Sequence, residues 1–197
     1  MLLHELLKNY RLILASNSPR RRQLLADCGL TFECAPKFEC DERYPSDLPV
    51  REVAEYLSRL KSECCPIALG DKDILLTADT VVIVGDTILG KPSDAGHAKE
   101  MLRMLSGRSH TVVTGVTLRS DGRRRSFSVA SDVRFRTLSD EEIEYYVDEY
   151  KPFDKAGAYG IQEWIGYVAI DGIDGSFYNV MGLPVQRLYV ELREFIG

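Results

Sequence analysis

The residues best suited to binding a phosphate lie in the stretch Ser16–Arg22. An apolar run that is predicted to be a strand ends here, and Pro19 suits the first position of a helix. The free N–H groups and the dipole at a helix start favour an anion. Ser16 adds a hydroxyl donor, and Arg20 adds a planar guanidinium that matches phosphate. Neighbouring helix residues point about 100° apart, so the three arginines at 20–22 cannot all face one ligand. An ordinary capped helix with solvated arginines is the alternative.

Two carboxylates are candidates for binding a proton or a metal ion. Asp79 follows the apolar strand predicted at 74–78, and a carboxylate at such a strand end is costly unless it binds a proton, a metal or a hydrogen-bond donor. Glu42, in an acidic loop, is a candidate second ligand for a hard cation such as Mg²⁺. The alternatives are a turn residue that caps the sheet for Asp79 and a solvated loop acid for Glu42.

Two lysines could add positive charge to the same site. Lys91 precedes a proline, which favours extended backbone, and Lys61 borders the apolar stripe of a helix predicted at 50–64. Each alone is more often a surface lysine whose stem covers apolar groups. Together with Arg20 they would form the cationic lining that a polyphosphate requires.

Two loops have the composition to approach a ligand closely. The first, DKAGAYGIQ at 154–162, combines glycines with the ring of Tyr159 and the amide of Gln162, which can read the edge of a base. The second, at 175–184, turns into a helix in the same way as the stretch at 16–22. Either loop could instead be only a well-ordered connection.

The elements that must position these residues predict an α/β or α+β fold with a mixed sheet. Apolar periodicity, caps and turn residues predict helices at 19–28, 50–64, 95–105, 139–150 and 184–195. They predict strands at 12–15, 32–38, 74–78 continued by 81–84, 87–89, 110–118, 125–135 and 166–173.

Composition limits the function classes. The chain has 197 residues, with 25 Lys+Arg against 30 Asp+Glu and a net charge of −5. The length suits a single domain over 1–197, or one split into two lobes, more than two independent domains. The acidic balance argues against a general nucleic-acid or membrane-surface binder. No apolar run approaches the roughly 20 residues of a membrane helix, and no secretory core is expected at residues 1–8, so we predict a cytoplasmic protein.

The five cysteines predict no disulfide framework, because their number is odd and Cys64 and Cys65 are adjacent. No C-x-x-C pair or nearby histidine completes a zinc site. The cysteines are therefore interpreted as small buried hydrophobes in a reducing compartment. The chain also contains no Ser-His-Asp arrangement and neither a Walker nor a Rossmann glycine pattern.

A series of motifs, in order over nearly the whole chain, resembles the successive signatures of the Maf family. They are ASNSPRR at 15–21, ADTVV at 78–82, LGKP at 89–92, SGRSH at 106–110, TGV at 114–116, the loop at 154–162 and NVMGLP at 179–184. The resemblance implies a fold like that of inosine triphosphatases, with a long mixed sheet, flanking helices and two lobes around a central cleft. It also implies a homodimer.

The same resemblance implies an enzyme that cuts nucleoside triphosphates between the α- and β-phosphates and clears modified nucleotides. The loop at 154–162 is similar to the branch of the family that acts on dTTP and UTP, and differs from the branch that acts on 7-methyl-GTP. Mg²⁺ or Mn²⁺ is the implied cofactor. A small nucleotide is the implied partner, with neither nucleic acid nor a membrane.

Site residues follow from the resemblance position by position. Asp79 matches the proton acceptor, with Lys61 and Lys91 as catalytic lysines. Asp79 and Glu42 match the metal ligands. The substrate-binding and specificity positions are Ser16, Arg20, Thr80, Gln162, Asp154 and Lys155. Lys151 stands where relatives carry an acid, which puts any ion pair at that position in doubt.

Two other functions stay open from the sequence. One is a regulatory nucleotide-binding protein in cell division or septum formation. The other is the same reaction on a modified or purine triphosphate. The presence of Asp79, Lys61 and Lys91 favours an enzyme, because binding alone needs no proton acceptor.

Overall fold

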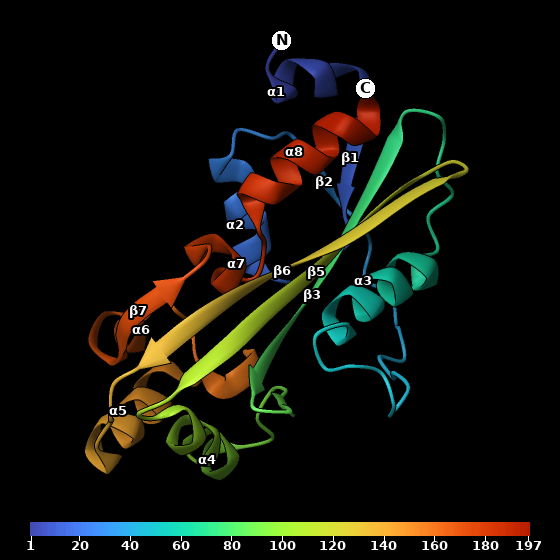
Figure 1. Ribbon diagram of the computed structural model, residues 1–197. Coiled ribbons are helices and arrows are strands. Elements are labelled where there is room, and N and C mark those ends of the chain that lie inside the picture. The colour runs from blue at the N-terminus through green and yellow to red at the C-terminus, as the bar shows by residue number, and fades with distance from the viewer. The chain divides into compact units, whose positions relative to one another are not determined.

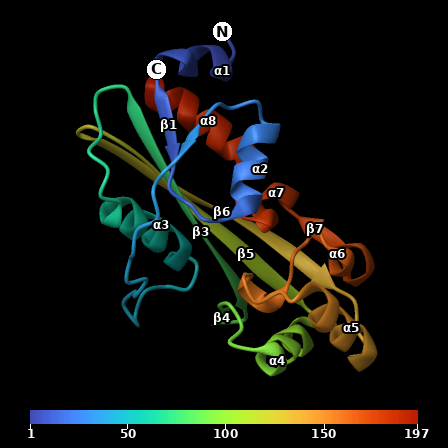
Figure 2. The ribbon, with the colours of Figure 1, turned by 180° about the vertical axis from the view of Figure 1, so that it is seen from behind.

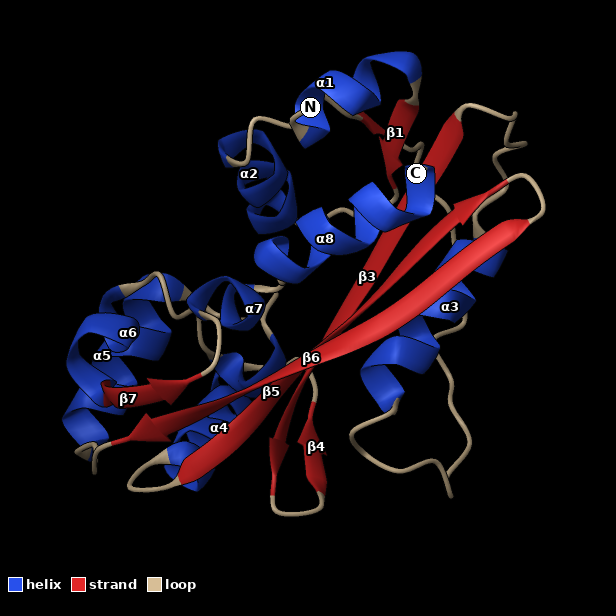
Figure 3. Ribbon diagram, turned by 45° about the horizontal axis from the view of Figure 1, so that its top comes forward, coloured by secondary structure: helices blue, strands red, loops and turns tan.

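The strands form one seven-stranded mixed sheet in the computed structural model, which describes residues 1–197 (Figure 3). The order is β2-β1-β3-β5-β6-β7, and β4 pairs with β3. β1 is parallel to both β2 and β3, whereas β4 is antiparallel to β3 and β7 is antiparallel to β6. The strands are β1 Arg11–Leu14, β2 Glu33–Cys34, β3 Asp73–Val84, β4 Thr87–Leu89, β5 Ser109–Ser120, β6 Arg123–Phe135 and β7 Ile170–Asp174.

Eight α-helices accompany the sheet, so the mixed α/β architecture is confirmed. Ser18 caps the second helix ahead of Pro19, and Ser139 forms a capping box with Glu142 at the start of the fifth. No helix combines the length and the apolar character that crossing a membrane requires. The helices are α1 Leu3–Leu6, α2 Pro19–Asp27, α3 Val53–Cys64, α4 Ala95–Leu105, α5 Asp140–Tyr150, α6 Trp164–Ala169, α7 Phe177–Met181 and α8 Val185–Ile196.

The chain divides into two compact units. Unit 1 contains Met1–Asp79, Thr114–Val129 and Gly182–Gly197, and unit 2 contains Thr80–Val113 and Ala130–Met181. The long strands β3, β5 and β6 each contribute residues to both units, and β3 passes from one to the other between Asp79 and Thr80. The organisation as a single domain with two lobes stays a prediction.

Unit 1 brings the two ends of the chain together. The backbone N–H of Leu3 donates to the hydroxyl of Tyr189 at 3.1 Å, and the hydroxyl of Tyr10 donates to the carbonyl of Ile196 at 3.3 Å. α1 therefore packs against α8, and the two termini lie close to each other in Figure 1. The closing segment of the chain is part of the same unit as β1.

Helix α3 is fixed tightly on the sheet in unit 1. A Cβ added to Gly115 of β5 would lie 2.3 Å from the backbone of Ala54, so only glycine allows this approach. The hydroxyl of Thr77 in β3 donates to the carbonyl of Ser58 at 2.7 Å, and the hydroxyls of Ser58 and Thr117 share a hydrogen bond of 2.8 Å. Because these contacts fix the middle of α3, they also fix the next turn of the helix, which contains Lys61.

Unit 2 has its own apolar core, in which α4 and α5 pack together (Figure 2). Its aromatic centre consists of His110, Phe135 and Tyr159, which make edge-to-face contacts with ring centroids 5.1 to 5.4 Å apart. His110 Nε2 and the Tyr159 hydroxyl form a hydrogen bond of 2.7 Å. Burial of the imidazole lowers the pKa of His110 to about 4.

Two predicted strands differ from the structure. The strand expected at 166–173 is wrong for its first half, because Trp164–Ala169 form α6 and only Ile170–Asp174 form β7. A Cβ on Gly166 would lie 1.7 Å from the carbonyl oxygen of Ile161, so this glycine allows α6 to pack directly on the loop before it. The strand expected at 32–38 is reduced to Glu33–Cys34. Short apolar runs of this kind fit a helix and a strand equally well.

Candidate active site

Asp79 lies within β3 and not at its end, which corrects the expected position. The strand continues through Asp79 and Thr80 to Val84. The residues around Asp79 are apolar or β-branched, and the end of the strand at 82–84 pairs with β4. Asp79 is only 9% exposed. A carboxylate with so little access to water needs a compensating partner.

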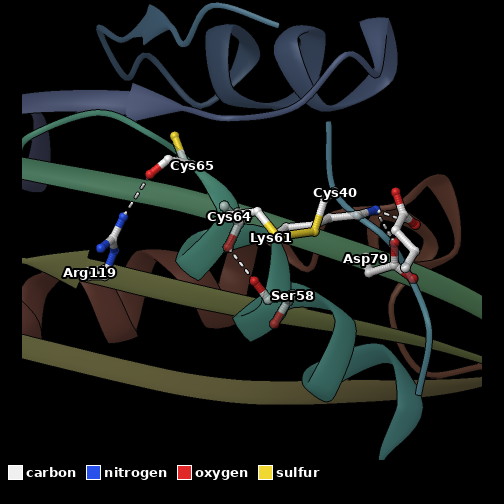
Figure 4. Close-up of a disulfide and its surroundings, with 9 residues drawn as sticks. Cys40, Ser58, Lys61, Cys64, Cys65, Asp79 and Arg119 are labelled. Atoms are coloured by element: carbon white, nitrogen blue, oxygen red, sulfur yellow. Dashed lines mark hydrogen bonds and ion pairs between the residues drawn. A yellow bond between two sulfur atoms is a disulfide. The ribbon is translucent and has the colours of Figure 1, made fainter. Parts of the chain in front are cut away.

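Lys61 is that partner, and it also contacts Glu42. Its ammonium group lies 2.5 Å from Oδ1 of Asp79 and 3.0 Å from Oε2 of Glu42. Figure 4 shows the Lys61 side chain extending from α3 towards Asp79. The three predicted residues therefore meet at one point in unit 1, with Asp79 on β3, Lys61 on α3 and Glu42 on the loop before α3.

This arrangement fits a cation bound together with a polyphosphate. One positive group, the Lys61 ammonium, already contacts carboxylates from two different segments. No cluster of three or more His, Cys, Asp or Glu side chains that could hold a metal ion occurs in the chain. Mg²⁺ commonly takes one or two carboxylates and completes its shell with substrate phosphates and water. The donor set of Asp79 and Glu42 matches that requirement.

The three successive arginines have different environments. Arg21 donates through Nε to the carbonyl of Gly182 at 2.8 Å and through Nη1 to the carbonyl of Ala78, also at 2.8 Å. Burial lowers the pKa of Arg21, and the nearby Asp79 carboxylate opposes that shift. Arg22 is exposed, and Arg20 is partly buried. The expectation that one or two of the arginines are structural or solvent-facing is confirmed.

Ser16 lies where the sequence places it, two residues after the end of β1. Its hydroxyl oxygen accepts from the N–H of Ser18 at 3.2 Å and from Nη1 of Arg21 at 3.3 Å. A serine hydroxyl that accepts hydrogen bonds can still donate its own proton. The predicted role of Ser16 as a donor to substrate is therefore compatible with these contacts.

The cysteine interpretation is wrong in two respects. Cys40 and Cys64 form a disulfide, with Cα atoms 5.7 Å apart (Figure 4). Of the free cysteines, Cys28 and Cys34 are exposed, and only Cys65 is buried. The counting rule failed because an odd total and an adjacent pair still allow one bridge between a loop and a helix.

Unit 2 contains the other predicted site residues. Thr80 follows Asp79 on β3, and Lys91 lies exposed after β4. Lys155 is buried, and its ammonium lies 2.8 Å from Oδ1 of Asp154 and 3.0 Å from Oε1 of Glu163. Asp154 and Lys155 are therefore paired with each other in the loop at 154–162.

The amide of Gln162 is the part of this loop best placed to recognise a ligand. Its Oε1 is buried and has no hydrogen-bond partner within the protein. A Cβ on Gly160 would lie 3.0 Å from Nε2 of Gln162, 2.9 Å from the Glu163 carboxyl carbon and 3.0 Å from Cε of Lys155, so these side chains surround the glycine. A buried carbonyl oxygen without a donor is well suited to accept a hydrogen bond from a ligand.

The sequence reasoning missed two contacts that shape this loop. The hydroxyl of Tyr146 on α5 donates to Glu163 and accepts from the N–H of Gly160 at 3.0 Å. Burial and the Glu163 carboxylate raise the pKa of Tyr146. The only sign of these contacts in the sequence is a tyrosine on the apolar face of a predicted helix, because a buried phenol needs a polar partner.

Comparisons with known proteins agree with the motif series. The family model described as "Maf-like protein" matches residues 11–195. A protein of Bacteroides thetaiotaomicron named "dTTP/UTP pyrophosphatase" is 51% identical over 95% of this chain and 97% of its own length. Proteins with the same name from Parabacteroides distasonis and Porphyromonas gingivalis are 50% and 52% identical, over 97% and 96% of this chain and 99% and 96% of their own lengths.

A solved structure described as a HAM1 protein from Coxiella burnetii also matches, over 94% of this chain and 99% of its own, with 15% identity and a TM-score of 0.47. A likeness this distant says nothing about activity. The family model and the relatives near 50% identity cover almost the full length. The chain belongs to the Maf family.

Proposed function

We propose that this chain is a nucleoside triphosphate pyrophosphatase that hydrolyses dTTP and UTP to the nucleoside monophosphate and pyrophosphate. The names of the relatives near 50% identity support the reaction and the substrate. The structural observation that carries the proposal is the meeting of the buried Asp79 carboxylate with Lys61 and Glu42. Hydrolysis needs a proton acceptor at this position, whereas binding alone does not.

Asp79 acts as the proton acceptor for the attacking water. Lys61 engages Oδ1, so we assign the acceptor role to the other oxygen, Oδ2. A carboxylate fixed on a sheet strand can orient a water for in-line attack on the α-phosphorus and accept its proton as the bond forms. The ion pair with Lys61 also keeps the carboxylate in one rotamer, which limits the entropy lost when the water is oriented.

Lys61 and Arg20 stabilise negative charge on the substrate. The Lys61 ammonium has three N–H donors and contacts two carboxylates, so one donor remains for a substrate oxygen. Arg20 lies in the first turn of α2, where the helix dipole and free N–H groups also favour an anion. These groups stabilise charge that increases as the pyrophosphate leaves.

Asp79 and Glu42 would bind a divalent cation together with the substrate. When bound, Mg²⁺ or Mn²⁺ would neutralise the triphosphate and orient its oxygens. Thr80, Lys91, Asp154, Lys155 and Gln162, all in unit 2, keep the substrate and leaving-group roles that the family resemblance assigns to them. For Gln162 the buried Oε1 supports a role as acceptor for the imide N–H that thymine and uracil share.

The test is pyrophosphate release from a panel of nucleoside triphosphates with Mg²⁺ or with Mn²⁺. We expect release from dTTP and UTP well above release from the purine triphosphates. No release from dTTP or UTP with either metal would refute the substrate assignment. No release from any member of the panel would refute the enzyme and favour a regulatory nucleotide-binding protein.

Location and assembly stay predictions from the sequence. They comprise a cytoplasmic protein, a homodimer, and no nucleic-acid or membrane partner. Sedimentation of the purified protein and fractionation of cells test them separately from the activity.

A further inference from the structure

The Cys40–Cys64 disulfide links two of the segments that meet at Asp79. Cys40 lies two residues before Glu42 in the loop, and Cys64 lies three residues after Lys61 on α3. Residues three apart on a helix lie on the same face, so the sulfur bridge and the Lys61 side chain leave α3 in similar directions. Figure 4 shows the bridge beside the Lys61 side chain.

The loop has little else to keep Glu42 in place. Residues 35–52 contain neither a helix nor a strand, and residues 41–47 are all exposed. The side chain of Glu42 is 50% exposed in its ion pair with Lys61. An ion pair this exposed contributes little by itself. Phe38 packs against an apolar cluster earlier in the loop, and the disulfide is the covalent link to α3 that lies two residues from Glu42.

We propose that the Cys40–Cys64 disulfide positions Glu42 for the reaction and that its reduction weakens binding of the divalent cation. The inference rests on the function proposed above. When the bridge is intact, Glu42 is restricted to the vicinity of Lys61 and Asp79, which raises its effective concentration there. When the bridge is broken, the loop samples many conformations, and Asp79 lacks its second carboxylate for most of the time.

The bridge opens and closes by thiol–disulfide exchange. A thiolate of a dithiol reductant attacks one cysteine sulfur, and the other cysteine leaves as a thiolate. The second thiol of the reductant then resolves the mixed disulfide. The reductant ends as a cyclic disulfide, and Cys40 and Cys64 together gain two electrons and two protons. A low-molecular-weight disulfide such as oxidised glutathione drives the reverse exchange.

Both sulfurs can be reached by such a reagent, because Cys40 and Cys64 are only partly buried. In the predicted cytoplasmic location most structural disulfides are not stable, and those that form are commonly redox-responsive. The position of this bridge next to Lys61 would couple that response to activity.

The first experiment compares the oxidised and dithiothreitol-reduced protein in pyrophosphate release from dTTP as the Mg²⁺ concentration is varied. We expect reduction to raise the half-saturating Mg²⁺ concentration on the order of tenfold, while kcat at saturating Mg²⁺ changes much less. A bridge with a purely structural role would lower kcat through loss of folded protein and leave the half-saturating concentration unchanged.

The second readout does not depend on activity. Trypsin cleavage after Arg43, whose side chain is 89% exposed, should become faster by at least about threefold on reduction, because cleavage tracks how often the loop opens. Peptide mapping without reductant establishes which cysteines are joined in each sample.

Matched variants separate this bridge from the other thiols. Cys40→Ser with Cys64→Ser should behave like the reduced protein and should not respond to dithiothreitol. Cys28→Ser with Cys34→Ser removes two exposed free thiols and should respond as the wild type does.

The inference is overturned if mapping finds no Cys40–Cys64 link after treatment with oxidised glutathione. It is also overturned if breaking the mapped link changes neither the Mg²⁺ dependence nor the cleavage after Arg43. If the protein hydrolyses no nucleotide, oxidised or reduced, but cleavage after Arg43 becomes faster on reduction, the proposed function is refuted. That result would still show that the disulfide restrains the loop.

Discussion

Arg21 offers a sharp test of how the site is built, because its side chain connects three segments of unit 1. Its guanidinium donates to the carbonyls of Ala78 and Gly182 at 2.8 Å each and to Ser16 Oγ at 3.3 Å. Ala78 immediately precedes Asp79. We therefore predict that Arg21→Met destabilises the protein and also lowers its activity.

The magnitude follows from the bonds that are lost. Hydrogen bonds from a charged donor contribute about 1.5 to 3 kcal/mol each, and the two short bonds alone would give about 3 to 6 kcal/mol. In the variant, water can partly replace the guanidinium at these two carbonyls, so we expect a loss in the lower part of this range, about 3 to 4 kcal/mol. Methionine fills a similar volume without any donor, so the change tests the bonds more than the packing.

The assay is urea unfolding of two variants in parallel, Arg21→Met and Arg22→Met. Arg22 is exposed and makes only a 3.5 Å contact with the Ser16 carbonyl, so Arg22→Met should stay within about 0.5 kcal/mol of the wild type. If Arg21→Met costs no more than Arg22→Met, Arg21 does not join these segments and the reasoning fails. A destabilised Arg21→Met protein that keeps full kcat in its folded fraction would show that Ala78 does not control the position of Asp79.

Further predictions concern catalysis, packing and pH. Asp79→Asn should lower kcat by at least about a hundredfold and leave a cooperative unfolding transition, and retained activity would remove Asp79 from the mechanism. In urea unfolding, Gly115→Ala should cost about 1 to 3 kcal/mol of stability, because the new Cβ would overlap the backbone of Ala54. The control Gly90→Ala should cost far less, because a Cβ there meets nothing within 4 Å. Equal losses would contradict the close packing of α3 on the sheet. Burial lowers the pKa of His110 from 6.5 to about 4, so between these values the unfolded chain binds a proton that the native state does not. In unfolding experiments at each pH, the wild type should lose about 3 kcal/mol more than His110→Gln as the pH falls from 6.5 to 4, because the titration of the carboxylates is common to both proteins.

Local signals made most helices predictable. α2 begins where Ser18 and Pro19 indicate, α5 begins at its capping box, and α8 follows Pro184. In each case the residues that start the helix are adjacent in the chain, so their effect does not depend on the rest of the fold. Long helices with a continuous apolar stripe, such as α3, are determined in the same local way.

The features that were missed depend on contacts between distant residues. Asp79 can be buried within β3 because Lys61, 18 residues earlier, neutralises its carboxylate. Cys40 pairs with Cys64 because α3 is fixed on the sheet through Gly115, which lies far along the chain. Neither composition nor periodicity in a short window contains this information.

The site residues were available from the motifs, but their arrangement was not. The sequence indicated Asp79, Lys61 and Glu42 as separate candidates, and the structure shows that one ammonium group contacts both carboxylates. The sequence could not indicate which of the three arginines at 20–22 points inward, because that depends on the carbonyls of Ala78 and Gly182.

The division of the chain into units has a consequence for its synthesis. Unit 1 consists of three segments and unit 2 of two, so the chain passes between the units four times and neither can be obtained by a simple truncation. The last segment, Gly182–Gly197, supplies α8 and the carbonyl that Arg21 binds. Because a ribosome makes this segment after the other two segments of unit 1, a nascent chain cannot complete the surroundings of Asp79 until residues 182–197 have been synthesised. The Asp79 site therefore forms late in synthesis, although Asp79 itself is made early.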